Sequence, residues 1–260
     1  LPRVNGVDAI LMLHGVGGNF YNSTVLNFLT ARFLERRSNV LRVNTRGHDF
    51  VSLGQTEAGP RRQGAGFETV SDCHFDVTAW CDFLRQRGVQ RIGVVGHSLG
   101  AIKAIHAAAH EPHPAIGWIA ALSPPRLSYH GFVTGPRRAL FQRTVERARE
   151  QVDRGNPHAL IRATYPFPLL ITAAGYLEKY GPDEHYNFLR FVHRLPCPIL
   201  FTYGQRELES GSVAFHDLPK ILAEITAPAH SIDCITIADA DHLYTDCGAP
   251  LADQLLDWLE

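Results

Sequence analysis

Short runs of apolar residues alternate along the chain with longer segments in which apolar residues recur every three or four positions. The runs predict buried strands, and the longer segments predict amphipathic helices. The first pair shows the pattern: residues 7–13 form an apolar run, and residues 23–37 place Leu26, Leu29 and Phe33 on one helical face. Short buried strands alternating with helices are typical of an α/β fold, with a mostly parallel sheet and helices on both faces.

The alternation continues along most of the chain. Further strands are predicted over residues 40–43, 92–95, 116–122, 199–203 and 235–237, and further helices over residues 71–87, 99–110 and 250–259. Residues 51–69 are rich in Gly, Gln and Arg, and we expect a loop there.

Residues 124–195, here called the insertion, break the alternation. They contain no convincing strand and begin with two prolines, followed by a charged helical segment at 136–154 and by aromatic helical pieces. We expect a helical cap between two strands of a core built from residues 1–123 and 196–260. Its aromatic residues and two leucines are mostly expected in the interior of the cap, with some lining a pocket: Tyr165, Phe167, Leu169, Leu170, Tyr176, Tyr180, Tyr186, Phe188 and Phe191.

Composition narrows the functional classes. The chain has 260 residues, of which 45% are hydrophobic and 20% charged, as in a globular protein with a substantial core. The formal net charge of −1 argues against a general attraction to nucleic acid or to an anionic membrane. No apolar run reaches the roughly 18 residues of a membrane-spanning helix. The first residues, Leu1 to Val4, show no signal-peptide pattern, so the cytoplasm is expected, although a leader could precede them.

Three polar groups of residues have structural interpretations. The five cysteines include no CxxC pair, so reduced and mostly buried thiols are expected. His106, His110 and His113 have a spacing that could present metal ligands, but no carboxylate or cysteine completes a set, so no metal site is expected. The arginines of the insertion favour a solvated helix face, with a basic rim for an anionic substrate or membrane surface as the alternative: Arg137, Arg138, Arg143, Arg147, Arg149 and Arg154.

The most informative motif is the pentapeptide Gly96-His97-Ser98-Leu99-Gly100, between a predicted strand and a predicted helix. A serine on such a sharp turn has a strained backbone, and its neighbours two residues away must be tiny. The turn exposes the Ser98 hydroxyl and directs the amide N–H of Leu99, at the helix start, toward the same space. This context predicts a nucleophilic serine.

A second glycine-rich segment, from His14 to Gly18, follows the first strand. Glycines let the backbone approach a ligand closely. We therefore expect the Val16 amide to supply a second hydrogen-bond donor to an oxyanion, beside that of Leu99. His14 is expected to shape the loop by hydrogen bonding rather than to catalyse.

These motifs resemble those of the α/β-hydrolases, and the resemblance covers nearly the whole chain. It implies a catalytic triad in the order nucleophile, acid, histidine. The acid is implied after the strand that ends at residue 203, where Glu207 is favoured and Glu209 is the alternative, although the family more often has Asp. The histidine is implied at His242, with Asp241 shaping its loop.

The segment Asn44-Thr45-Arg46-Gly47-His48 is similar to a DxRGxG turn found in many members of the family, with Asn in place of Asp. We interpret it as a brace for the loops around the site. A contact between His48 and a substrate is the alternative.

The combined motifs predict a serine hydrolase for a small carboxylic ester or thioester, working through an acyl-enzyme without metal or organic cofactor. Hydrolysis of amide or carbon–carbon bonds uses the same groups and stays open. An alternative from another class is a ligand receptor on a hydrolase fold with negligible turnover. The natural substrate, the acyl length and the oligomeric state are not predicted.

Overall fold

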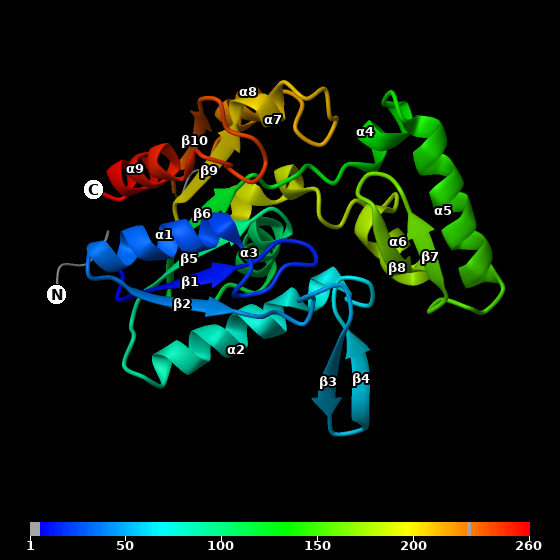
Figure 1. Ribbon diagram of the computed structural model, residues 1–260, viewed down its shortest axis with the longest axis horizontal. Coiled ribbons are helices and arrows are strands. Elements are labelled where there is room, and N and C mark those ends of the chain that lie inside the picture. Colours follow the sequence, from blue (N-terminus) through cyan, green and yellow to red (C-terminus); the bar gives the residue numbers. More distant parts are fainter. Residues whose placement is uncertain (1–5, 228–229) are drawn as a thin grey trace.

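Six strands form one parallel sheet in the order β10-β9-β6-β5-β1-β2 (Figure 1). They are β1 (Ala9–Leu13), β2 (Asn39–Val43), β5 (Ile92–His97), β6 (Ile116–Leu122), β9 (Ile199–Gly204) and β10 (Ile232–Ile237). The computed structural model describes residues 6–227 and 230–260, so the N-terminal segment Leu1 to Val4 lies outside the described residues. All six strands were predicted, and the α/β fold class is confirmed.

Helices cover both faces of the sheet (Figure 1). One face packs against α1 (Thr24–Glu35) and α9 (Gly248–Trp258), with Leu26, Phe33 and Leu255 among the buried residues. The other face packs against α2 (Cys73–Arg85), α3 (Leu99–His110) and α8 (Leu218–Ala223), and against the short helices η3 (Phe188–Arg190) and η4 (Val192–Arg194). A sheet covered on both faces explains the nearly unbroken apolar runs of its central strands.

The insertion packs around its own hydrophobic cluster beside the α3 N-terminus. It contains α4 (Tyr129–Thr134), α5 (Arg138–Asp153), β7 (Leu160–Ala163), β8 (Leu169–Thr172) and α6 (Ala173–Tyr180). The expectation of no strand was wrong, because β7 and β8 pair as an antiparallel ribbon. Each strand has four residues and buries only part of its side chains, so neither forms a continuous apolar run.

The expectation of a loop over residues 51–69 was also wrong in part. Strands β3 (Ser52–Thr56) and β4 (Gly59–Gln63) form an antiparallel hairpin, and the short η2 helix (Val70–Asp72) follows before α2. Gly59 has φ +106, which permits the tight turn. Neither strand has a buried residue, so the alternation of apolar and polar residues that predicts a strand is missing. The hairpin projects from the body of the molecule (Figure 1).

The carboxyl ends of the parallel strands place four loops at one edge of the sheet. These loops follow β1, β5, β9 and β10, and the loop after β9 contains the one-turn helix α7 (Gln205–Leu208). In open parallel sheets this edge is where ligands bind. Within the described residues, no helix combines the length and the apolar character needed to span a membrane.

Candidate active site

Ser98 occupies a sharp turn between β5 and α3, with φ 55 and ψ −119. A Cβ atom at Gly96 would lie 2.5 Å from the Gly100 carbonyl oxygen, and one at Gly100 would lie 2.5 Å from the carbonyl oxygens of Leu13 and His14. Only glycine fits at these two positions, as the strained turn requires. The backbone N–H of Ser98 donates to the Leu122 carbonyl at 2.8 Å, which ties the turn to β6.

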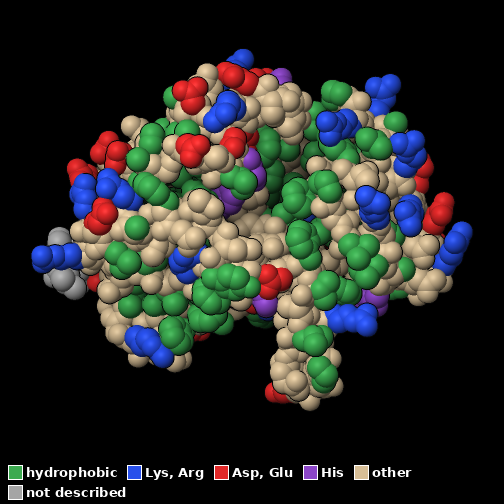
Figure 2. Space-filling model, viewed as in Figure 1, with side chains coloured by type: hydrophobic (Ala, Val, Ile, Leu, Met, Phe, Trp, Pro, Cys, Tyr) green, Lys and Arg blue, Asp and Glu red, His purple; other side chains and the backbone are tan. Residues whose placement is uncertain are grey.

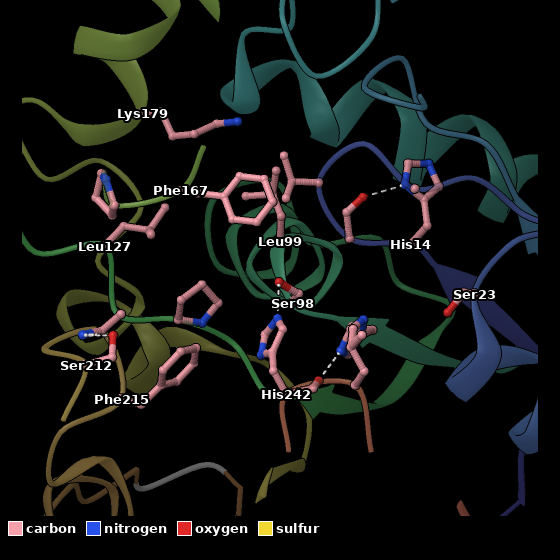
Figure 3. Close-up of a pocket in the computed structure, with 18 of the residues that line it drawn as sticks. His14, Ser23, Ser98, Leu99, Leu127, Phe167, Lys179, Ser212, Phe215 and His242 are labelled. Atoms are coloured by element: carbon pink, nitrogen blue, oxygen red, sulfur yellow. Dashed lines mark hydrogen bonds between the residues drawn. The ribbon is translucent and has the colours of Figure 1, made fainter. Parts of the chain in front are cut away.

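The loops after β9 and β10 bring two further predicted residues to Ser98. The Nε2 atom of His242 lies 3.0 Å from Ser98 Oγ, and His242 Nδ1 hydrogen-bonds Glu207 Oε1. Figure 3 shows the His242 ring pointing at the serine hydroxyl from the opposite side of the pocket to Leu99. In the tautomer that fits both contacts, Nδ1–H donates to Glu207 and Nε2 accepts the serine proton.

Glu207 is held on its second carboxylate oxygen as well. Oε2 accepts hydrogen bonds from the Ser123 hydroxyl at 2.7 Å and from the Gly204 amide at 3.3 Å. The Tyr244 hydroxyl lies 2.9 Å from Ser123 Oγ and donates to the Thr202 carbonyl. Because Glu207, Ser123 and Tyr244 are all buried, this network of hydrogen bonds holds the carboxylate in one orientation. The sequence pointed to none of these supporting hydroxyls.

The alternative acid, Glu209, is exposed and hydrogen-bonds Gln205. The structure therefore brings Glu207, and not Glu209, to His242. Asp241 accepts hydrogen bonds from the amides of Leu243 and Thr245, which lowers the pKa of its carboxyl against the effect of burial. This contact agrees with a loop-shaping role.

Two backbone amides line the pocket close to Ser98. The N–H groups of Val16 and Leu99 have no hydrogen-bond acceptor within residues 6–227 and 230–260. Leu99 is the first residue of α3, where a helical N–H has no partner in its own helix. A Cβ atom at Gly15 would lie 3.2 Å from Ser98 Cβ, so the glycine-rich loop passes close to the serine. Both amides are thus available to a ligand.

Two buried histidines support the loops. His14 donates from Nδ1 to the Gly15 carbonyl and accepts from the Thr45 amide at Nε2. His97 donates from Nε2 to the His242 carbonyl at 2.8 Å. Burial lowers the pKa of both imidazoles to about 4, so both are neutral at physiological pH. His97 is a support that the sequence did not reveal.

A buried charge cluster lies beside the site. Glu68 bridges Lys103 of α3, at 2.6 Å, and Lys179 of α6, at 3.4 Å. Burial alone would raise the pKa of the Glu68 carboxyl, but the two ammonium charges outweigh it and lower that pKa. A Cβ atom at Gly47 would lie on Glu68, so this glycine makes room for the carboxylate. A lysine within the apolar, alanine-rich α3 was the sequence signal that could have revealed the cluster.

The turn around Gly47 makes structural contacts. The Arg46 guanidinium pairs with Asp72 and Asp76, Thr45 accepts a hydrogen bond from Lys103, and Asn44 accepts one from the Phe20 amide. His48 pairs with Asp49 and does not line the pocket. These contacts favour the bracing interpretation.

A pocket of about 400 Å³ opens over Ser98 between the core and the insertion. Figure 2 shows the surface hollowed between these two parts. The core supplies the His14–Val16 segment, Ser98, Leu99 and His242. The insertion supplies mainly apolar and aromatic side chains, together with one charged residue: Leu127, Phe132, Tyr165, Phe167, Lys179 and Tyr180.

The residues set aside by the sequence lie away from this pocket. The rings of His106 and His110 stack at 4.3 Å, whereas His113 contacts Asp82. The arginines around α5 are exposed. The five cysteines are free thiols, and four of them are buried. The apolar and aromatic residues expected in the cap differ from this group, because Tyr165, Phe167 and Tyr180 line the pocket. Phe167 and Leu170 are exposed, while the others are buried. The expectation of a place in the cap interior was wrong for Phe188 and Phe191, because these residues pack in the cluster against the sheet.

The chain belongs to the alpha/beta hydrolase family, whose model matches residues 10–254. None of the curated proteins matches it significantly in sequence. The fold itself is shared with solved structures at low sequence identity.

Three of these structures illustrate the likeness. Est1E from Butyrivibrio proteoclasticus, solved with ferulic acid, has a TM-score of 0.68 at 17% identity and covers 98% of this chain and 89% of its own. The esterase PF2001 of Pyrococcus furiosus has a TM-score of 0.63 at 19% identity, covering 98% and 82%. A monoacylglycerol lipase of Paleococcus ferrophilus has a TM-score of 0.61 at 16% identity, covering 96% and 93%. At these identities the likeness shows the fold alone.

Proposed function

We propose that this protein is a serine hydrolase that cleaves a carboxylic ester or thioester, with Ser98 as nucleophile, His242 as general base and Glu207 as the acid of the triad. The observation that carries the proposal is the continuous hydrogen-bonded chain from Ser98 Oγ through the His242 ring to Glu207. The three residues come from three separate loops, and a purely structural serine would not need them.

The contacts support a two-step reaction. His242 Nε2 takes the Ser98 proton as Oγ attacks the carbonyl carbon, and Glu207 stabilises the imidazolium that forms. The unpartnered amides of Val16 and Leu99 hold the negative oxygen of the tetrahedral intermediate, and each such donor contributes about 3 kcal/mol to lowering the barrier. His242 returns the proton to the leaving alcohol or thiol. A water activated by the same imidazole then cleaves the acyl-enzyme.

The surroundings of Ser98 favour an organic acyl group. Leu127, Phe132 and Tyr165 of the insertion form an apolar wall, so the insertion acts as a cap that excludes water and selects the acyl chain. The esterase and the lipase named above agree with an ester substrate.

Ser98→Ala is the direct test. We expect a fluorophosphonate probe to label the wild-type protein at Ser98, and the alanine variant to lose both labelling and hydrolysis of p-nitrophenyl esters. The variant should keep the wild-type melting temperature, because the change removes one hydroxyl oxygen. Probe labelling of a Ser98→Ala variant at wild-type rate would refute the assignment.

The same ester assay separates the proposal from a receptor on this fold. A hydrolase releases p-nitrophenol continuously, in large excess over protein. A receptor releases at most one equivalent and then stops.

A further inference from the structure

Lys179 lines the pocket, although its side chain is only 1% exposed. It is a buried cation among the mainly apolar and aromatic side chains that the insertion contributes to the pocket. A buried ammonium group is costly unless it is paired and hydrogen-bonded. Its contacts therefore decide whether the protein itself satisfies its charge.

The hydrogen bonds and ion pairs of the described residues satisfy the Lys179 ammonium group only weakly. Among the described residues, the only polar partner of Lys179 Nζ is Glu68 Oε1, at 3.4 Å, whereas Lys103 holds Oε2 of the same carboxylate at 2.6 Å. Lys103 also donates to Thr45. An ammonium group has three donors, so two of those on Lys179 have no acceptor in the described part of the chain.

The charge balance points the same way. One carboxylate, Glu68, is ion-paired with two ammonium groups, so positive charge exceeds negative charge within these ion pairs. The nearby carboxylate of Glu178 directs its oxygens to the amides of Val70 and Ser71 and to the Tyr186 hydroxyl. It attracts Lys179 through space but accepts no hydrogen bond from it. His14, close to Lys103, is neutral and adds no further positive charge.

The same helix contributes a second polar group to the pocket. Tyr180 follows Lys179 on α6 and also lines the pocket. Its hydroxyl has no hydrogen-bond partner among the described residues, and the ring is buried among Phe132 and Tyr176. The pocket wall thus includes two donors from α6 that the described residues satisfy only in part or not at all, which suits an acceptor that carries negative charge.

The direction of the reaction assigns this place to the acyl group. His242 protonates the leaving oxygen, so the leaving group lies beside His242, while the carbonyl oxygen lies against the Val16 and Leu99 amides. The acyl chain must then extend away from His242. Figure 3 shows Lys179 and Phe167 across the Ser98 hydroxyl from His242.

We propose that Lys179 binds a free carboxylate at the far end of the substrate's acyl group, so that the preferred substrates are half-esters of dicarboxylic acids. This inference rests on the proposed function and specifies its substrate class. The carboxylate would supply the acceptors that Lys179 lacks and neutralise the excess charge, while the apolar wall packs against the methylene chain.

The test compares matched substrates on the full chain. We would measure kcat/KM for p-nitrophenyl half-esters of adipic and longer dicarboxylic acids, and for p-nitrophenyl esters of monocarboxylic acids of equal length, with spontaneous hydrolysis subtracted. The wild type should prefer the anionic member of each pair. In Lys179→Met this preference should fall by about 10- to 100-fold, the range for a hydrogen bond to a charged group.

The controls separate recognition from folding. Lys179→Arg should keep most of the preference, and Lys220→Met, at an exposed lysine, should leave it unchanged. If Lys179→Met does not fold, the ester preference of the wild type and of Lys179→Arg still tests whether Lys179 binds a carboxylate. A wild type that favours the neutral esters, or a Lys179→Met variant that folds and keeps the anionic preference, would overturn the inference. If neither ester is hydrolysed and Ser98 takes no probe, the proposed function itself fails.

Discussion

Glu207 accepts hydrogen bonds on both carboxylate oxygens, one from the His242 ring and one from a supporting hydroxyl. Oε1 accepts from the His242 ring, while Oε2 accepts from the Ser123 hydroxyl. Rotation of the carboxylate would break both. Ser123 therefore acts on the proposed reaction through Glu207 and is a positioning residue. It has φ 49, an unfavourable conformation for serine, and this strain is held by the hydrogen bond of its amide to Thr202.

Ser123→Ala tests this positioning role. We expect kcat to fall about tenfold or more, because loss of a hydrogen bond to a charged group costs about 1.5–3 kcal/mol and frees the Glu207 carboxylate to rotate. KM should change little, since Ser123 does not line the pocket. Steady-state kinetics with a p-nitrophenyl ester would measure both constants.

Ser128→Ala is the matched control for this variant. Ser128 is also a buried serine that donates to a carboxylate, Glu184 Oε1 at 2.8 Å, but within the insertion. Its loss should lower the melting temperature with little change in kcat. Equal falls in kcat for the two variants would show that Ser123 contributes only to general stability.

The site residues that the sequence predicted all follow strand ends. Ser98 could be predicted because the sharp turn restricts its neighbours to glycine. His242 and Glu207 could be predicted from their positions in the loops that follow two late strands. Ser123 and Tyr244 could not, because a hydroxyl that supports a carboxylate across the fold belongs to no local pattern. Lys179 was hidden among aromatic residues, since its burial depends on how the insertion packs over Ser98.

At the scale of elements, the junction between β5 and α3 determines the position of Ser98. The helix starts directly after Ser98 and passes so close to the loop after β1 that a side chain at Gly100 has no space. This close approach brings the Leu99 amide and the glycine-rich loop to the same side of the serine. Any movement of the helix away from β1 would separate the two amides.

Gly100→Ala should therefore disturb both stability and reactivity. The new Cβ atom would lie 2.5 Å from two backbone oxygens, which cannot move as a flexible side chain would. We expect a loss of about 1–3 kcal/mol in the free energy of unfolding, as in an overpacked core, together with slower labelling of Ser98 by a fluorophosphonate. Urea unfolding and labelling kinetics would measure the two effects.

Gly131→Ala provides the comparison for this variant. A Cβ atom at Gly131, in α4, would make ordinary contacts of 3.5 Å and more with Ser128. Its stability and labelling rate should stay close to those of the wild type. If Gly100→Ala behaves like Gly131→Ala, the close approach of α3 to the β1 loop does not limit this site.

Elements were predictable from the sequence where burial imposes a pattern. The four inner strands of the sheet, β9, β6, β5 and β1, are buried, and their apolar runs follow from that burial. The edge strands β2 and β10 are only partly buried. The β3–β4 hairpin is not covered, and β7–β8 is half covered, so their pairing depends on backbone hydrogen bonds and turn geometry that leave little trace in the order of apolar residues. The boundaries of α3 matched the prediction because Ser98 and the strand before it fix where the helix starts.

At the scale of the whole molecule, several buried titratable groups have protonation states that differ from those in the unfolded chain. Burial lowers the pKa of His14, His97 and His106 to about 4. In the unfolded chain these imidazoles have a pKa of about 6.5 and take up protons first. Their contribution to stability is therefore complete above pH 6.5 and is lost as the pH falls toward 4.

Glu178 has the opposite effect on the pH dependence of stability. Burial raises the pKa of its carboxyl to about 7, so its contribution to stability is complete below its unfolded pKa and is lost as the pH rises through 7. Between pH 6.5 and 4.5, three histidines bind protons on unfolding while one glutamate releases its proton. The balance of these four groups favours the unfolded chain as the pH falls.

We therefore expect the free energy of unfolding to decrease by about 1–2 kcal/mol per pH unit between pH 6.5 and 4.5, as measured by urea unfolding at a series of pH values. His106→Gln should reduce this slope, because it removes one of the three histidines without touching Ser98 or its partners. His185→Gln, at an exposed histidine, should leave the slope unchanged. A free energy of unfolding that stays constant or rises on acidification would mean that the buried histidines bind protons as readily in the folded protein as in the unfolded chain.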